Sequence, residues 1–170
     1  MREFFAEAGH PSSLSMRAML DPLHRILEKE GPFHGVLGYC EGASIAATLL
    51  ISNQRRCEAQ RIENTLTNAI FFSGVPPRHP DGDEMILADR YGPVIKARTV
   101  HVFSPSDPFR HCCLALYNVC DEDNAKIFDH GKGHVIPRDR RDIEDLGAFV
   151  RRFLVAEVSR QGDSVSATES

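Results

Sequence analysis

The decapeptide GVLGYCEGAS at residues 35–44 decides the fold. Its apolar first half, Gly35–Tyr39, predicts a short buried strand, and the stretch Ala43–Ser52 predicts a helix. Between them, the segment Gly38–Gly42 matches the G-x-S-x-G pattern of a nucleophile elbow, with Cys40 in the place of serine. In an open parallel sheet, such an elbow presents its central side chain at the carboxyl end of a strand.

The geometry of an elbow explains the residues around Cys40. The turn is tight, so we expect a Cβ at Gly38 or Gly42 to collide with the neighbouring strand or helix. The turn also aims the thiol away from the sheet and makes the Glu41 backbone N–H a candidate oxyanion donor. A helix N-terminus favours thiolate over thiol, whereas the Glu41 side chain opposes this unless it points outward. The alternative is a buried structural cysteine in a glycine-rich turn.

Outward from the elbow, helical periodicity alternates with short apolar runs. The first helix spans Ser13–Glu30, and Pro22 either kinks it or starts a second helix. A polar segment at residues 78–91 predicts a loop with a helical turn. The remaining elements are three strands and a closing helix, expected at Ala69–Val75, Thr99–Ser104, Ala125–Phe128 and Arg138–Val158. This alternation predicts an α/β fold with a doubly wound, shortened parallel sheet of about four strands.

A thiol nucleophile needs a base, and the base needs an orienting carboxylate. Asp107 follows the third expected strand, and His134 follows the fourth, which is the order nucleophile, acid, histidine of α/β-hydrolases. Glycines around His134 allow its loop to swing back over the elbow. Alone, Asp107 would be read as a turn residue before proline and His134 as a loop histidine. His130 is a weaker candidate for the base.

The other cysteines and histidines carry no comparable pattern. Cys112 and Cys113 lie in an expected helix and favour core packing, and His101 lies within a strand and favours a structural role. No metal-ligand spacing and no glycine-rich phosphate loop is present, so neither a metal nor a cofactor is expected. Five cysteines without a C-x-x-C pair indicate a reducing cytosol rather than a disulfide framework.

Length and charge narrow the class of protein. The 170 residues predict one domain at 1–158, with a polar, disordered tail at 159–170. A net charge of −4 argues against a nucleic-acid partner. The N-terminus lacks a signal-peptide core, and the longest apolar stretch, Ala43–Ile51, is too short to cross a bilayer. We therefore expect a cytoplasmic protein that is not bound to a membrane.

Four blocks resemble the fungal FSH-type serine hydrolases, and within them the LovG-type thioesterases of polyketide clusters. The blocks are Gly31–Ser44, Ala69–Pro77, Val100–Pro108 and Phe128–Arg138. The resemblance implies an α/β-hydrolase fold and hydrolysis of an ester or thioester. It further implies release of an acyl chain from the carrier domain of a polyketide synthase. By motif position, Cys40, Asp107 and His134 take the nucleophile, acid and base roles.

The chain departs from that family in two respects. The family usually has serine at the position of Cys40. Its members also begin with a strand ending in His-Gly, which supplies a second oxyanion donor, and this chain starts after that point. We therefore expect a domain truncated at its N-terminus, with weak activity. We also expect an uncovered sheet edge at Gly35–Tyr39 that favours self-association.

The function expected from the sequence is acyl hydrolysis by a Cys-His-Asp triad. Acyl transfer between two thiols is nearly balanced in free energy, so a cysteine nucleophile suits thioesters better than unactivated oxyesters. The first alternative is a catalytically weak or dead paralogue that binds an acyl chain or a synthase. The second is an enzyme similar to dienelactone hydrolases, which use cysteine on small lactones.

Overall fold

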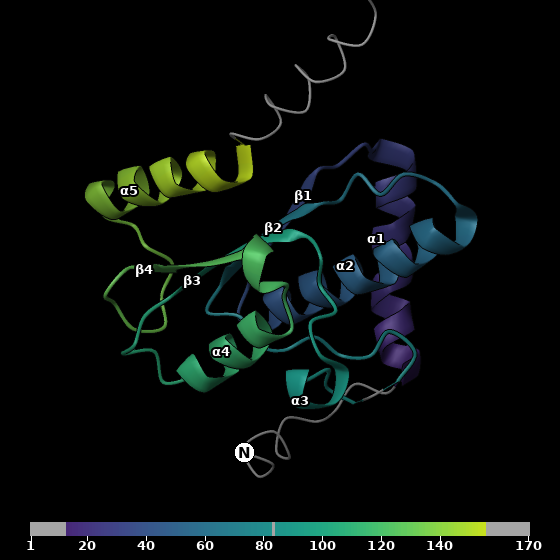
Figure 1. Cartoon of the computed structure of the whole chain (residues 1–170), viewed down its shortest axis with the longest axis horizontal. Helices are drawn as coiled ribbons and strands as arrows, with labels where there is room; N and C mark the ends of the chain where they lie inside the picture. The colour runs from purple at the N-terminus through teal and green to yellow at the C-terminus, as the bar shows by residue number, and fades with distance from the viewer. Residues whose placement is uncertain (1–12, 83, 156–170) are drawn as a thin grey trace, which may run out of the picture.

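The computed structural model describes residues 13–82 and 84–155 of the chain, and their centre is a parallel sheet (Figure 1). Its strands are β1 (Gly35–Tyr39), β2 (Asn68–Phe72), β3 (Arg98–Phe103) and β4 (Ala125–Asp129). They pair in the order β1-β2-β3-β4, and every pairing is parallel. The expected α/β fold with a shortened parallel sheet is therefore confirmed.

Helices cover both faces of the sheet, as a doubly wound fold requires. They are α1 (Ser13–Glu30), α2 (Glu41–Gln60), α3 (Ala88–Tyr91), α4 (Arg110–Asn118) and α5 (Arg140–Val150). A 3-10 turn, Glu122–Asn124, precedes β4, and a π-helical turn, Arg151–Val155, follows α5. Helices α1, α2 and α4 lie on one side of the sheet and α5 on the other (Figure 1). No helix in the described ranges is long and apolar enough to span a membrane.

The larger core lies between the sheet and the helices α1, α2 and α4. Alternate residues of each strand point to this side, so that Phe71 of β2 and Ala125 of β4 are buried against it. Small residues of α2, such as Ala43 and Ala47, let that helix approach the sheet closely. From α1, Met16 closes the core with only 2% of its surface exposed.

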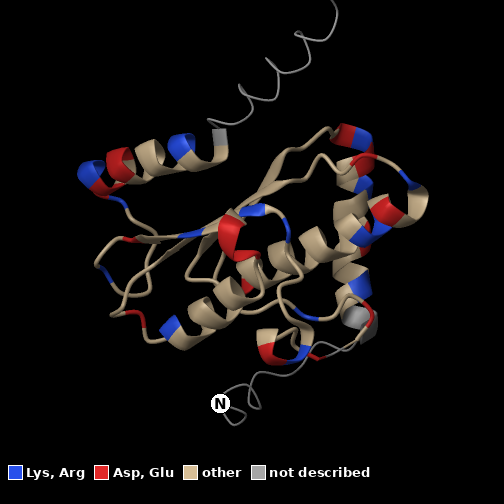
Figure 2. Cartoon of the chain, viewed as in Figure 1, with Lys and Arg blue, Asp and Glu red and all other residues tan. Residues whose placement is uncertain are grey.

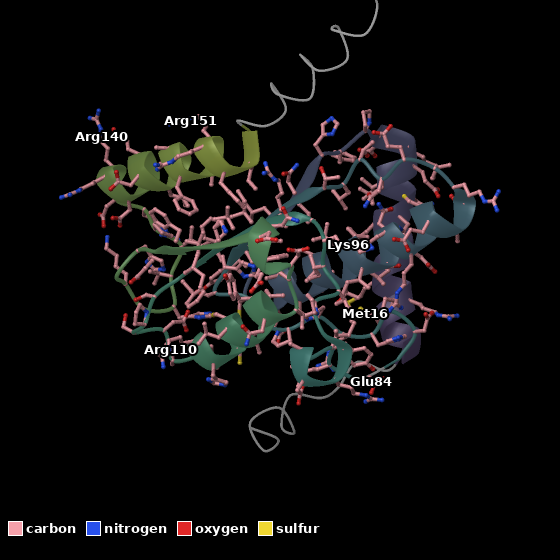
Figure 3. The ribbon with its side chains drawn as sticks, viewed as in Figure 1. Met16, Glu84, Lys96, Arg110, Arg140 and Arg151 are labelled. Carbon is pink, nitrogen blue, oxygen red and sulfur yellow. The ribbon has the colours of Figure 1, made fainter. Side chains whose placement is uncertain are left out.

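The smaller core lies under α5. Phe72, Val100 and Val102 are buried there and pack against Leu146 and Phe149, among others. The polar side of α5 faces solvent, and Figure 3 shows Arg140 and Arg151 pointing away from the sheet. An amphipathic helix of this kind is held mainly by burial of its apolar stripe.

Strand β1 is left partly uncovered on the α5 side. Leu37, which is paired in register with Ile70 of β2, is 60% exposed, and Tyr39 is 38% exposed. Within the described residues β1 pairs only with β2, so its second edge has no strand beside it. This agrees with the expected uncovered edge at Gly35–Tyr39.

Several boundaries differ from the sequence-based predictions. α1 runs unbroken through Pro22, and α2 continues to Gln60 rather than ending at Ser52. The extension is rich in good helix formers, and buried Cys57 anchors it. Strand β2 stops at Phe72 instead of Val75, because Ser73 takes a positive φ of 43° that ends the extended backbone.

The closing helix is shorter than predicted. It was expected over Arg138–Val158, whereas α5 begins at Arg140 and gives way to the π-helical turn after Val150. Asp139 stands immediately before α5 with extended backbone, as the residue preceding a helix commonly does. Residues 156–158 and the expected tail at 159–170 lie outside the described residues.

Candidate active site

Cys40 occupies a strained turn between β1 and α2. Its φ of 52° and ψ of −118° lie in a region that residues other than glycine rarely adopt. The turn is held by two backbone hydrogen bonds: the Cys40 N–H donates to Phe72 O at 2.9 Å, and the Ala43 N–H donates to Cys40 O at 3.1 Å. The thiol is half-buried at the carboxyl end of the sheet. This is the backbone geometry that the G-x-C-x-G pattern predicts.

The two glycines of the elbow differ in what they make possible. A Cβ on Gly38 would lie 2.5 Å from Ala43 Cα and 2.7 Å from Gly42 O, so glycine is required there. A Cβ on Gly42 would meet no described atom within 4 Å. The expected collision at Gly42 is therefore wrong for the described residues, because this position faces open space at the start of α2.

Glu41 is the first residue of α2, so its backbone N–H has no acceptor within the helix. It follows Cys40 directly, as the oxyanion donor of an elbow does. The Glu41 side chain is exposed, and water therefore screens its charge from the thiol. The sequence left this orientation open.

Asp107 lies in the loop after β3, and its side chain is completely buried. Its Oδ1 accepts a hydrogen bond from the Phe109 N–H at 2.8 Å. Burial alone would raise the pKa of this carboxyl. Interactions with the Ser73 hydroxyl, the Phe109 N–H and His134 outweigh that effect and lower the pKa of Asp107 below its usual value. The carboxylate is therefore ionised at neutral pH.

His134 lies in the loop after β4 and pairs with Asp107. Its Nδ1 is 3.1 Å from both Oδ1 and Oδ2 of the carboxylate. The Phe109 ring meets the imidazole edge-on, with centroids 5.1 Å apart. Gly133 passes close to the acid loop, since a Cβ there would lie 3.8 Å from Ser106 O. The imidazole is thus oriented by a carboxylate and held by an aromatic ring.

The loop that carries His134 also returns across the sheet to the elbow. Three strand spacings separate β1 from β4, a span of about 14 Å. Even so, the rings of Tyr39 and His134 lie 5.4 Å apart, and the Tyr39 hydroxyl donates to His134 O at 3.4 Å. The acid–base pair therefore contacts the residue directly before Cys40. Among the described residues no hydrogen bond joins the Cys40 thiol to His134 itself.

An open cavity adjoins His134 on the side of Tyr39. Its volume is about 440 Å³, and the chain segment 134–139 forms much of its wall. Val135 and Ile136, which line it, are 46% and 40% exposed. Val135 and Ile136 form an apolar part of the lining, whereas Lys132, Arg138 and Asp139 make the rest of it charged.

Three supporting residues were not singled out from the sequence. Tyr39 and Phe109 hold the imidazole, and Ser73 lies beside Asp107. The Ser73 hydroxyl is buried, and within the described residues it makes no hydrogen bond of standard distance and angle. The Ser73 backbone takes the positive φ noted above. The only available signal was position, since Tyr39 belongs to the elbow and Phe109 follows Asp107 by two residues.

The other candidate residues remain outside this arrangement. His101 is buried between Phe71 and Tyr117 and bonds to Thr99, which confirms its structural role. His130 is 7% exposed, and neither ring nitrogen has a hydrogen-bond partner among described residues.

The remaining cysteines, Cys57, Cys112, Cys113 and Cys120, are buried and free. For Cys112 and Cys113 this confirms core packing on α4. No group of three or more potential metal ligands gathers within residues 13–82 and 84–155.

A tight turn after a parallel strand, followed by a carboxylate and a histidine on later strand ends, defines the class of α/β-hydrolases. The chain belongs to the family described as "Serine hydrolase (FSH1)", whose model matches residues 2–146. Membership of a hydrolase family agrees with the expectation of a hydrolase acting on ester bonds. Cys40 therefore stands where the family name implies serine.

Three relatives illustrate the family. "Esterase FPY3" of Fusarium mangiferae is 32% identical over 160 residues, covering 89% of this chain and 71% of that protein. "Hydrolase phiM" of Talaromyces stipitatus is 30% identical over 79% of this chain and 55% of that protein. "Esterase OVCA2" of Danio rerio is 25% identical, covering 89% of this chain and 64% of that protein. The chain thus spans about half to seven-tenths of these relatives.

Among solved structures, the fold is similar to that of a protein of unknown function from Agrobacterium tumefaciens. The TM-score is 0.53 at 16% identity, and the match covers 82% of this chain and 64% of the other. At this identity the likeness concerns the fold alone.

Proposed function

We propose that the chain hydrolyses ester or thioester bonds, with Cys40 as nucleophile, His134 as general base and Asp107 as the residue that orients His134. One observation carries the proposal. His134 is bonded through Nδ1 to a buried, ionised carboxylate while its ring contacts Tyr39, the neighbour of Cys40. A histidine fixed in this way keeps Nε2 available for a proton.

In the proposed reaction, the Cys40 thiol gives its proton to His134 Nε2, and the thiolate attacks the carbonyl carbon of the substrate. The Glu41 backbone N–H stabilises the tetrahedral oxyanion. Collapse of this intermediate breaks the bond to the leaving alcohol or thiol, which takes the proton from His134. Water then gives a proton to His134 and attacks the acyl-cysteine, which releases the acid and restores the thiol. Asp107 stays ionised throughout and stabilises the imidazolium.

Two features favour an apolar acyl thioester as the substrate. Transfer of an acyl group from one thiol to another has little free-energy cost, so Cys40 is suited to thioesters. The cavity beside His134 exposes Val135 and Ile136, which can cover an acyl chain. The resemblance to LovG-type thioesterases supports a finer proposal, namely release or editing of an acyl or polyketide chain carried on a synthase.

A second candidate function is binding of an acyl chain without turnover. It is favoured because no hydrogen bond within the described structure joins the Cys40 thiol to His134. It is also favoured because Glu41 is the one oxyanion donor that we identify among described residues. Loss of one such donor typically costs about 100- to 1,000-fold in turnover.

Intact-protein mass after exposure to an acyl thioester separates these functions. We expect turnover, or a persistent adduct of one acyl group, in the native chain and in a Cys57→Ala control. Cys40→Ala should show neither turnover nor an adduct. His134→Ala should lose turnover by a factor similar to that of Cys40→Ala, because triad members act as a unit. Unmodified native protein without turnover would favour the binding function. Retained turnover in both Cys40→Ala and His134→Ala would contradict the mechanism.

A further inference from the structure

A second hollow lies between α1 and the C-terminal half of α2. The elbow lies at the opposite, N-terminal end of α2. The volume of the hollow is about 630 Å³, and the Pro80–Asp81 segment closes one side. Ser52, on its wall, is twelve residues from Cys40, which places the hollow about 18 Å along α2 from the thiol. It is therefore separate from the candidate active site.

Arginine dominates the lining of this hollow. Arg17 and Arg25 come from α1, and Arg55 and Arg56 come from α2. Figure 2 shows basic segments along α1 and the later part of α2. The three carboxylates of the lining, Asp21, Glu28 and Asp81, are outnumbered by these four guanidinium groups.

Two of the four arginines have no carboxylate partner among residues 13–82 and 84–155. Arg17 is paired with Asp81 at 2.6 Å, and Arg56 is paired with Glu28. Within the part of the chain that the structure describes, Arg25 and Arg55 form no ion pair, and both are exposed. Their guanidinium groups are free to bind an anion, with the planar geometry that suits oxyanions.

Unpaired nitrogens also lie beneath these exposed groups. His24 is 7% exposed and its Nε2 is 3.0 Å from Ser52 Oγ, but its Nδ1 is buried and has no hydrogen-bond partner among the described residues. The Nε of Arg56 is likewise buried, and no residue in the described part of the chain bonds to it. A buried polar group without a partner costs about 1–3 kcal/mol and commonly marks a missing water or ion. When the Ser52 hydroxyl donates to His24 Nε2, the proton of the neutral ring lies on Nδ1, and both Nδ1–H and the Arg56 Nε–H can then donate to a ligand that accepts hydrogen bonds.

The neutral state of His24 is compatible with an anion in the hollow. Burial, and then the charge of Arg56, lower the pKa of His24, so the imidazole is neutral at neutral pH. Asp21 and Glu28 act in the opposite direction and do not overcome these effects. An anion in the hollow would offset the repulsion from Arg56.

We propose that this hollow, lined by Arg25, Arg55, Arg56 and His24, binds the phosphoryl group of a soluble small molecule. A phosphoryl group has three terminal oxygens and a charge near −2, so it can use more of these donors than a carboxylate can. The volume leaves room for the rest of the molecule. The site has no role in the proposed hydrolysis and is assigned independently of it.

The test is isothermal titration calorimetry of the native chain with inorganic phosphate and with pyrophosphate at constant ionic strength. We expect saturable binding. The double variant Arg25→Gln, Arg55→Gln should weaken binding at least about tenfold, because two charge-assisted contacts are lost. Ester hydrolysis without phosphate should be unchanged. The double variant Arg140→Gln, Arg141→Gln removes the same charge from α5 and should bind like the native chain.

Several results would overturn the proposal. They are absence of saturable binding to both phosphate and pyrophosphate, equal weakening in the α5 control, and tighter binding of malonate than of phosphate. Binding to vesicles of phosphatidic acid without binding to either free anion would also exclude a soluble ligand. A second readout is the His24 ring in NMR spectra, whose resonances should shift on addition of phosphate. Unchanged His24 resonances during saturable binding would place the anion elsewhere.

Discussion

The centroids of the Tyr39 and His134 rings lie 5.4 Å apart, although Tyr39 ends β1 and His134 follows β4, the strands at opposite edges of the described sheet. The contact brings the histidine loop, which begins after β4, back to the elbow that ends β1. Asp107, which comes from the loop after β3, lies between these edges and holds His134 through Nδ1. Three loops that are far apart in the chain therefore meet at the carboxyl ends of the strands.

We predict that Cys40 is the most reactive of the five thiols. It is half-buried at a helix N-terminus, whereas burial raises the pKa of Cys112 to about 11 and those of Cys113 and Cys120 to about 12. Brief labelling with iodoacetamide at neutral pH, followed by peptide mapping, should find the label on Cys40 first. Preferential labelling of Cys57 or Cys112 would contradict the nucleophile assignment.

The glycines of the elbow should respond differently to alanine. In Gly38→Ala the new Cβ would overlap the backbone of α2, so we expect a loss of about 3 kcal/mol in the free energy of unfolding. Gly42→Ala meets open space and replaces glycine inside a helix, so its effect should lie between zero and about 1 kcal/mol of stabilisation. Chemical denaturation measures both. Equal destabilisation would mean that residues outside the described part pack against Gly42.

Buried His101 should make stability fall in mild acid. Burial lowers its pKa from 6.5 to about 3, so below pH 6.5 the unfolded chain binds a proton that the folded chain does not. Stability from this residue is complete above pH 6.5 and decreases as the pH falls toward 3. Between about pH 7 and pH 5 we expect a loss of about 2 kcal/mol.

His101→Gln isolates this contribution, because glutamine can keep a hydrogen bond to Thr99 and does not titrate. Its free energy of unfolding, measured by urea denaturation at both pH values, should depend less on pH than that of the native chain. Exposed His34 supplies the matched control His34→Gln. An identical pH dependence in the native and His101→Gln chains would show that His101 does not stay neutral.

The uncovered side of β1 should promote self-association. Leu37 is 60% exposed on a strand whose second edge has no partner in the described sheet. Leu37→Lys should therefore lower the mass measured by light scattering at high concentration. Ile143, which is 53% exposed on α5, gives the control Ile143→Lys. A monomeric native chain, or equal effects of both substitutions, would rule out this edge as the contact.

Sequence alone was sufficient for the local parts of this fold. The pentapeptide Gly38–Gly42 between an apolar run and a small-residue helix determined the elbow, because a tight turn leaves no room for a Cβ at Gly38. The order Cys40, Asp107, His134 along alternating elements indicated which loops reach the same sheet edge. These are properties of short segments and of parallel topology, and both can be read without coordinates.

The tertiary structure decided what depends on atoms distant in the chain. Open space at Gly42, the end of β2 at Ser73, and the contact of Tyr39 with His134 all result from how separate elements pack. The nitrogens of His24 and Arg56 that lack a partner in the described structure are likewise buried because α1 and α2 enclose them. Periodicity reports which face of an element is apolar, but burial of a given polar atom depends on its neighbours from other elements, which only the packed chain supplies.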